Sequence, residues 1–388
     1  VQAQCSVSIG YGNNGDLKEP QPLILKEHDK DFLYPNKDEL RTVALNTGDS
    51  IYVACPGKGN HINGVNDQEA RVICRNQKLF VLAGQERTFS SITCVYKPEI
   101  STRIMPRNCL GSYTSLAIGF QLRDKFLPTI EVCRNDNTYE TYYTKFQLSN
   151  NIKHYQQGYP RQVQPNWRQE THFNGMDMSR LYNRDVQSSA IGNSLGFGKP
   201  DSRVNAQQYL SRGHLTAKTD FLYGRQQDTT FTYLNAAPQW ATFNNKNWNN
   251  LESAVRNLAA TRRLDLTIFT GVHGEMTMSD VHGQQRKITV FESGSKKPML
   301  VPRFFWKVVY DAANKKGTAF VGLNDPFISS TSTTPDLFLC DNIIQSSRIP
   351  WLSLESSLVS GYVYACPVDS LRRKIQRIPP MDVKDILI

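Results

Sequence analysis

The sequence of 388 residues has no apolar run long enough to cross a bilayer. A spanning helix needs about 18 or more consecutive apolar residues, whereas runs such as Thr114–Phe120 and Phe304–Tyr310 have the length of a strand. Internal repeats are also absent. We therefore expect no membrane segment, and the 39% hydrophobic content predicts a sizeable core instead of disorder. At about 100–200 residues per domain, the length predicts two domains.

The sequence also lacks closely spaced cysteine pairs. Its eight cysteines lie at positions 5, 55, 74, 94, 109, 133, 340 and 366, and no two are near enough for a CxxC metal motif. An even number of widely spaced cysteines favours disulfides over free thiols and predicts a secreted, extracellular protein. Because no basic and apolar leader precedes Val1, we expect that a signal peptide has already been removed.

Positive charge is distributed unevenly. The chain has 45 Lys and Arg against 35 Asp and Glu, a net charge of +10. A division at residue 126 leaves +2 on residues 1–126 and +8 on residues 127–388. A basic domain attracts polyanions, of which nucleic acid is the commonest, although heparin or anionic lipid fits the charge equally well.

The two parts also differ in their expected secondary structure. Residues 1–126 read as a β-rich accessory domain without a visible site, because short alternating runs lie between Gly, Asn and Pro. Residues 150–210 predict long surface loops, and 247–263 predicts a helix with one apolar face. The runs expected to form strands are Ser50–Ala54, Ala70–Cys74, Leu79–Ala83, Ser91–Tyr96, Thr129–Cys133, Thr141–Phe146, Leu264–Thr270, Lys287–Phe291, Phe304–Tyr310 and Thr318–Gly322.

The segment 209–256 combines side chains that suit phosphodiester chemistry. The strand-like sequence YLSRGHL places Arg212 and His214 on one side, two residues apart. A long connection then leads to Asn244, which we expect at the entrance of a helix that carries Glu252 and Arg256 on consecutive turns. We expect strand, loop and helix to converge on one point.

This segment resembles the DNA/RNA non-specific endonucleases of the ββα-metal, or His-Me finger, class, and within it the secreted arthropod nucleases that prefer duplex substrates. The family pattern D-R-G-H, N-x-x-P-Q and N-x-x-x-W-x-x-x-E-x-x-x-R is matched by Ser211–His214, Asn235–Gln239 and Asn244–Arg256. Ser211 stands where the family usually has Asp. The likeness continues more weakly over residues 127–325.

The resemblance implies an α+β fold, namely a ββα-metal nuclease domain with a mixed antiparallel sheet and helices over 127–388, preceded by the accessory domain 1–126. It implies that His214 is the general base, that Asn244 binds the metal directly and that Glu252 holds metal-bound water. Arg212 is expected to act with them in catalysis. The substrate-binding residues implied are Asn235, which would also anchor the loop to the strand, Gln239 and the phosphate-contacting Arg256.

The implied reaction agrees with these residue types. Phosphodiester hydrolysis needs a proton acceptor for water and charge neutralisation at the phosphate, and a neutral imidazole accepts a proton at physiological pH. A hard cation that keeps most of its water suits a single Asn ligand, which favours Mg²⁺, with Mn²⁺ as the alternative. DNA, and RNA as a second substrate, are the expected partners, with 5′-phosphate products and no nucleotide cofactor. The oligomeric state stays open.

Each site residue also has a structural interpretation. His214 alone is typical of a structural or surface histidine, and Glu252 with Arg256 is an ordinary i,i+4 helix pair. Asn244 is a natural N-cap. The joint order and spacing favour the catalytic interpretation over these, and over a non-catalytic polyanion-binding protein of the same fold.

Three other histidines and one serine are not expected to be catalytic. His273 and His282 read as turn residues, as does His172 with Asp177, because no third metal ligand accompanies either pair. Ser211 precedes His214 on a strand that would turn its hydroxyl away from the imidazole, so a Ser-His-Asp triad is not supported.

Cysteine parity predicts how the two parts are linked. With five cysteines before residue 126 and three after it, an odd number of disulfides must cross the boundary if all eight are paired. Cys133 lies nearest the junction and is the expected nuclease-side partner. Cys340 and Cys366 should then pair with each other, and the two parts should form one rigid unit.

Overall fold

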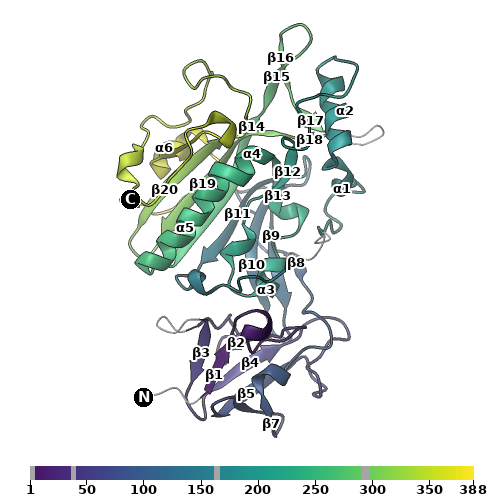
Figure 1. Ribbon diagram of the computed structural model, residues 1–388, viewed down its shortest axis with the longest axis vertical. Helices are drawn as coiled ribbons and strands as arrows, with labels where there is room; N and C mark the ends of the chain where they lie inside the picture. Colours follow the sequence, from purple (N-terminus) through teal and green to yellow (C-terminus); the bar gives the residue numbers. More distant parts are fainter. Residues whose placement is uncertain (1–4, 36–40, 161–166, 291–297) are drawn as a thin grey trace.

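The computed structural model describes residues 5–35, 41–160, 167–290 and 298–388. Figure 1 shows a smaller N-terminal unit below a larger C-terminal unit. The N-terminal unit, residues 5–100, holds a five-stranded antiparallel sheet in the order β2-β4-β5-β6-β7 and a separate β1-β3 pair. Its strands are β1 (Cys5–Ser8), β2 (Leu23–Lys26), β3 (Thr42–Leu45), β4 (Ser50–Ala54), β5 (Glu69–Asn76), β6 (Leu79–Leu82) and β7 (Gln85–Thr88).

The C-terminal unit is built on an eight-stranded antiparallel sheet in the order β21-β20-β19-β14-β11-β10-β9-β8. The long central strands are almost wholly buried, which explains their continuous apolar runs. The strands are β8 (Ser101–Ile104), β9 (Thr114–Gln121), β10 (Phe126–Asn135), β11 (Glu140–Leu148), β14 (Leu266–Glu275), β19 (Pro302–Asp311), β20 (Lys316–Leu323) and β21 (Val363–Cys366).

The division expected at residue 126 falls inside this large sheet. Phe126 is the first residue of β10 and pairs with Gln121 of β9, and β9 pairs in turn with β8. β8 and β9 are therefore part of the C-terminal sheet, because their backbone groups complete its ladder. The change from one sheet to the other lies near residue 100, with 11 basic and 12 acidic residues before it and 34 and 23 after it.

Helices cover the two faces of the large sheet. Residues of α5 (Asn249–Arg262) pack with Phe305 and Val309 on one face, and residues of α6 (Val368–Lys374) pack with Trp306 and Val308 on the other (Figure 1). Side chains alternate along β19, so each strand residue contributes to only one core. The shorter helices are α1 (Met178–Leu181), α2 (Arg184–Ser194), α3 (Gly224–Asp228) and α4 (Ala241–Phe243).

Three two-stranded ribbons complete the C-terminal unit. β12 (Leu210–His214) pairs with β13 (Ala236–Trp240) beside the large sheet. The other pairs are β15 (Thr277–Ser279) with β16 (Gln285–Lys287) and β17 (Thr289–Val290) with β18 (Met299–Leu300). None of the helices in the described ranges is both long and apolar enough to cross a bilayer.

The two units share one hydrophobic core and several polar contacts. Buried side chains of both belong to a single cluster. The Nζ of Lys30 lies 2.8 Å from Glu69 Oε2 in its own unit and 2.9 Å from Asp124 Oδ2 across the junction. Gln156 Nε2 donates to the carbonyl of Ile9 at 2.7 Å. Packing and hydrogen bonds therefore fix the N-terminal unit against the C-terminal unit.

The disulfides pair as parity predicted, but they do not join the two units. Cys109 bonds Cys133 and Cys340 bonds Cys366, so one disulfide spans residue 126 and both expected C-terminal pairings are confirmed. Cys109 lies between β8 and β9, however, so the Cys109–Cys133 bond is internal to the large sheet. Cys5–Cys74 and Cys55–Cys94 lie within the N-terminal unit.

Most of the expected strands are present. β4 has the bounds predicted, and the apolar runs on each side of segment 209–256 lie in β10, β11, β14, β19 and β20. The strand expected at Ser91–Tyr96 is wrong, because Cys94 makes only an isolated bridge to Ile62 there. The expected strand at 287–291 is divided between β16 and β17, and its last residue lies outside the described ranges. Within 150–210, the sequence missed the helix α2, whose N-cap is Asn183.

Candidate active site

Arg212 and His214 lie on the same side of the ribbon β12-β13, as predicted. The ring of Trp167 is 4.8 Å from the imidazole of His214, and the Arg212 guanidinium lies 5.8 Å from the same ring. Phe231 meets His214 edge-on at 5.1 Å, and Arg212 Nε donates to the hydroxyl of Tyr233 at 3.1 Å. Aromatic side chains therefore hold both half-buried residues in place.

The glycine between them is required by close packing. A Cβ on Gly213 would lie 2.4 Å from Oε1 of Gln239, which belongs to the paired strand β13. Neither amide atom of Gln239 has a hydrogen-bond partner among the described residues, and the side chain is fully buried. Gln239, expected to bind substrate, instead supports the ribbon from beneath, because a buried side chain has no surface to offer a ligand.

Asn235 is likewise buried and acts as an anchor. Its Nδ2 donates to the carbonyls of Thr216 and Thr230, both at 2.9 Å, and its Oδ1 accepts from the backbone N–H of Thr216. These bonds join the turn before β13 to the chain that leaves β12. The expected anchoring role agrees with this geometry, whereas direct substrate contact does not, since the side chain is 0% exposed.

Asn244 lies inside a helix and not at its entrance. α4, a π-helical turn at Asn244–Trp248 and α5 follow one another without a break, and the backbone of Asn244 is helical. The N-cap interpretation is therefore wrong. A π turn contains one extra residue, and such turns are frequent at functional sites. Asn247 fixes this one, because its Nδ2 donates to the carbonyls of Glu355 and Gly361.

Ser211 orients the amide of Asn244. The Ser211 hydroxyl donates to the carbonyl of Gln239 at 2.8 Å and accepts a hydrogen bond from Asn244 Nδ2 at 3.1 Å. Since the amide nitrogen is engaged by Ser211, the oxygen Oδ1 is the end left for a cation. The same two bonds occupy Ser211, in agreement with the expectation that it does not serve as a nucleophile beside His214.

A second contact fixes the middle of α5. Arg256 Nη1 pairs with Asp220 at 2.9 Å, and its Nη2 donates to Ser253. The expected pair between Glu252 and Arg256 is replaced by this longer-range one. Because Ser211 meets Asn244 and Asp220 meets Arg256, the segment that carries His214 runs alongside the stretch of helix that carries Glu252.

Glu252 lies in a group of partly compensated charges. Burial, with the Asp220 carboxylate, raises its pKa to about 7, whereas the cations of Lys307 and Arg256 favour its ionised form. Lys307 is almost fully buried in β19 and donates to Thr270 Oγ1 at 2.6 Å; burial lowers its pKa. No role for Lys307 was predicted from the sequence. The feature that could have indicated one is a lysine at an inward position of the apolar run RFFWKVV.

The donor set fits a cation bound mostly through water. Among the described residues there is no group of three or more His, Cys, Asp or Glu that could hold a metal ion. An all-protein cage is thus not present in that part of the chain. One oriented amide oxygen, Asn244 Oδ1, with the carboxylate of Glu252 on the same helix, suits Mg²⁺, which needs few protein ligands.

The three other histidines considered in the sequence lie in a strand and in turns. His273 is in strand β14 and not in a turn, so that expectation is wrong. His282 is in a turn, where its N–H donates to Asp280 Oδ1. His172 is also in a turn, 3.4 Å from Glu170, and Asp177 caps α1.

A sequence profile of the DNA/RNA non-specific endonuclease family matches residues 112–371, which is more than half of the chain. The chain belongs to this family. It is therefore a nuclease with a nucleic-acid substrate, in a family of metal-dependent enzymes, and the α+β fold confirms the predicted fold class. The matched range begins before residue 126, in agreement with the extent of the large sheet.

Curated relatives match almost the whole chain. A salivary endonuclease of Lutzomyia longipalpis is 24% identical over 98% of this chain and 86% of the relative. The salivary protein Tsal2A of Glossina morsitans morsitans is 24% identical over 100% of this chain and 95% of its own length. A solved structure of the EndoG/EndoGI complex matches 66% of this chain and 87% of its own, with 17% identity and a TM-score of 0.39.

Proposed function

We propose that this nuclease is a secreted, Mg²⁺-dependent endonuclease that hydrolyses phosphodiester bonds of duplex DNA, and of RNA as a second substrate, with little sequence preference. The observation that carries the proposal is the pair of contacts, Ser211 to Asn244 and Asp220 to Arg256, that align the His214 segment with the helix. These contacts bring a proton acceptor, an amide oxygen and a carboxylate into one region.

His214 is the residue best suited to take the proton from the attacking water. The aromatic rings of Trp167 and Phe231 restrict the imidazole, so little rotational freedom remains to be lost when substrate binds. A positioned general base typically contributes about 10²–10⁴-fold to the rate. Arg212, fixed by Tyr233, is placed on the same side to neutralise the phosphate.

Asn244 and Glu252 are the residues that would hold the cation, Asn244 through Oδ1 and Glu252 through water. When bound, Mg²⁺ would supply positive charge to stabilise the developing charge on the phosphate and the leaving 3′-oxygen. Lys307 favours the ionised form of Glu252, which is the form that accepts hydrogen bonds from water. Arg256, one turn after Glu252, remains the proposed phosphate contact, with Asp220 holding its guanidinium.

The proposed lack of sequence preference follows from the kind of contact that the protein can make with nucleic acid. Arginine contacts to phosphate do not distinguish base sequence, which agrees with non-specific cleavage. Residues after 100 carry 34 basic and 23 acidic side chains, so the unit that contains the site attracts a polyanion. Products with 5′-phosphate ends follow if the 3′-oxygen is the leaving group. The four disulfides and the salivary relatives are consistent with an extracellular location.

Incubation of supercoiled plasmid with the full chain tests the proposal. We expect nicking and linearisation in Mg²⁺, and none after EDTA is added. An intact plasmid in Mg²⁺, with binding retained in a gel-shift assay, would favour the non-catalytic polyanion-binding alternative. Rates on duplex and single-stranded DNA and RNA, compared in one buffer, would rank the substrates.

Asn244→Ala tests the metal assignment. We expect a higher Mg²⁺ concentration for half-maximal cleavage, by tenfold or more, with unchanged binding to DNA, because the amide ligand and its hydrogen bond to Ser211 are lost while the basic surface stays. Asn245→Ala, at the exposed neighbouring position, is the matched control. An unchanged half-saturation with an unchanged rate would place the metal elsewhere.

A further inference from the structure

A hollow of about 400 Å³ lies at the junction of the two units, outside the group of catalytic residues. Lys58, Tyr96 and Lys97 line it from the N-terminal unit, and Arg168 and Arg225 line it from the C-terminal unit. Four of these five residues are basic, and Glu99 is the one carboxylate among the described residues that line it. The hollow is therefore locally cationic, although residues 1–100 as a whole are not basic.

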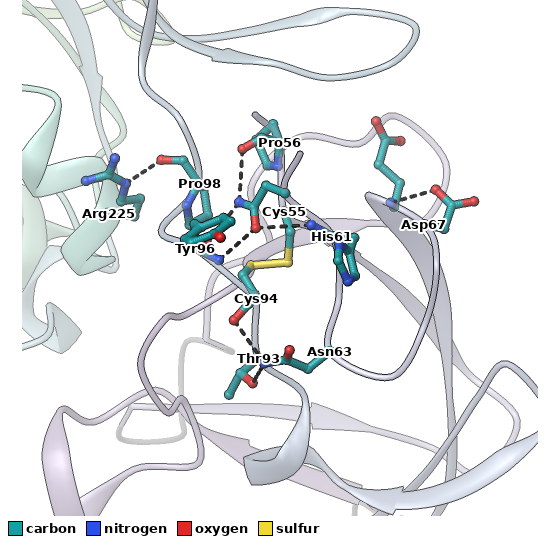
Figure 2. Close-up of a disulfide and its surroundings, with 12 residues drawn as sticks. Cys55, Pro56, His61, Asn63, Asp67, Thr93, Cys94, Tyr96, Pro98 and Arg225 are labelled. Carbon is teal, nitrogen blue, oxygen red and sulfur yellow. Dashed lines mark hydrogen bonds between the residues drawn. A yellow bond between two sulfur atoms is a disulfide. The ribbon is translucent and has the colours of Figure 1, made fainter. Parts of the chain in front are cut away.

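The N-terminal side of the hollow is held rigidly. The Cys55–Cys94 disulfide joins the start of the segment that carries Lys58 to the segment that carries Tyr96. Figure 2 shows the disulfide close to Tyr96. The amide of Asn60 bonds both backbone groups of Tyr96, accepting from its N–H at 2.8 Å and donating to its carbonyl at 2.9 Å. A surface fixed in this way loses little conformational entropy when it binds a ligand.

Two of the four basic side chains that line the hollow can contact a ligand, and the other two help to hold its walls together. Lys58 and Lys97 make no ion pair among the described residues, and the Lys97 ammonium lies 5.8 Å from the Tyr159 ring. Burial raises the pKa of the nearby Glu19 carboxyl, and the charge of Lys97 partly offsets this. Arg225 donates through Nε to the Pro98 carbonyl at 2.6 Å (Figure 2) and pairs with Asp228. Arg225 thus joins the units, while the two lysines are placed to meet a ligand.

Tyr96 adds an exposed aromatic ring beside these lysines. It is 63% exposed, although most large apolar side chains of the unit are buried. Its backbone is fixed by Asn60, so the exposure is not that of a loose loop. An aromatic platform next to cations is typical of surfaces that bind single-stranded nucleic acid, where bases stack on the ring and lysines meet phosphates.

The hollow also lies next to the active site along the chain. Arg168 lines it, and the preceding residue Trp167 is in contact with His214. The backbone at Arg168 is fixed by bonds from its N–H to the Phe231 carbonyl and from the Tyr233 N–H to its own carbonyl, both at 3.0 Å. One short, anchored segment therefore separates the hollow from the imidazole.

We infer that this hollow binds a single-stranded segment of the nucleic acid, with Lys58 and Lys97 contacting phosphates and Tyr96 stacking on an unpaired base. The inference rests on the proposed function for its ligand class, and assigns to the N-terminal unit a part in holding substrate. Duplex nucleic acid fits less well, because its bases are already stacked and offer no face to Tyr96.

Direct binding by the full chain tests this inference. All proteins carry His214→Ala, so the probes, a 20-nucleotide single strand and a 20-base-pair duplex, stay intact. The variants are Lys58→Gln with Lys97→Gln, Tyr96→Ala, and Tyr96→Phe, which keeps the ring. Arg75→Gln with Lys78→Gln, at the β5-β6 turn, removes the same charge as the control. Thermal unfolding verifies that each variant is folded.

We expect the lysine pair to weaken single-strand binding by about tenfold and to lower the slope of log K against log salt by about 1.4, since each phosphate contact on a single strand contributes about 0.7. Tyr96→Ala should weaken it fivefold or more, and Tyr96→Phe should not. Single-strand affinities within twofold of the parent, a loss confined to the duplex, or an equal loss in the charge control would overturn the inference.

The two proposals fail in different ways. An intact plasmid in Mg²⁺ would overturn the proposed endonuclease activity and leave the binding measurements to be judged by themselves. Normal cleavage with unchanged single-strand binding in the hollow variants would overturn only the inference about the hollow.

Discussion

The N-terminal and C-terminal units achieve order by different means. In residues 5–100, short strands carry two disulfides, as many as the much longer C-terminal unit has, and the 11 basic and 12 acidic side chains up to residue 100 nearly balance. The C-terminal unit has about three times the chain length and a sheet with helices on both faces. It encloses charged groups, among them Arg134, Asp220 and Lys307, that are at most 5% exposed.

The contrast shows which of the two units holds most of the buried charged groups. Burying a charge is costly unless partners compensate it, and a large, well-packed unit offers more positions that hold such partners in place. Asp220 pairs with Arg256, and Lys307 donates to Thr270 and is favoured in its ionised form by the carboxylates of Glu252 and Asp220. A small unit buries a smaller fraction of its surface, and cross-links then supply stability that the core does not.

The largest effect should come from the C-terminal unit. His214→Ala should lower kcat by about 10²–10⁴, because the proton acceptor is lost while the basic surface stays. His282→Ala, at an exposed turn, is the control and should have wild-type activity. Plasmid cleavage and DNA binding measured together check the result. A variant that retains more than about a tenth of the wild-type kcat would contradict the assignment.

Replacing Cys55 and Cys94 together by Ala tests the role given to cross-links. Loop-closure entropy for a separation of 39 residues predicts a loss of about 4 kcal/mol in the stability of the N-terminal unit. Chemical unfolding with limited proteolysis measures it, and cuts should appear first before residue 100. If cleavage began instead in the C-terminal unit, the contrast between the units would be wrong.

Lys307→Met tests whether the buried cation serves the site or only the core. Removing it leaves Glu252 facing Asp220 without that compensation, and loss of such a supporting group typically costs ten- to a hundredfold in activity or metal affinity. The kcat and the Mg²⁺ half-saturation are the measurements. Lys316→Met, on the exposed part of β20, is the control. Equal activities at equal stability would leave Lys307 with a packing role alone.

Lys30→Met should have the smallest effect, because it changes one pair within the N-terminal unit and one contact between the units. It removes the ion pairs to Glu69 and Asp124, and leaving the buried Glu69 carboxylate without this partner should cost about 1–2 kcal/mol. Lys26→Met breaks an exposed pair with Asp29 at 3.8 Å and should cost almost nothing. Denaturant midpoints compare the two; a larger loss for Lys26→Met would contradict the role of Lys30 at the junction.

Much of the site was predictable because its signals are local. Arg212 and His214 share a side of the ribbon since alternate residues of a strand do so, and the helix after Trp248 follows from its apolar spacing. The fixed spacing of the three motifs predicted His214, Asn244 and Glu252 together as candidate site residues. Cysteine parity, together with the position of Cys133 nearest the expected boundary, predicted Cys340–Cys366.

Only the tertiary structure shows the features that depend on residues distant from one another in the sequence. The division near residue 100, instead of 126, follows from which sheet β8 and β9 complete, and strand pairing between separate segments leaves no local signal. Gln239 and Asn235 were expected to contact substrate, but both are buried: Gln239 supports the ribbon and Asn235 anchors the turn before β13. Arg256 pairs with Asp220, 36 residues away, and Lys307 reaches Glu252 only because β19 lies beneath α5. Sequence spacing determined the catalytic residue types, whereas long-range packing determined which charges and amides hold them.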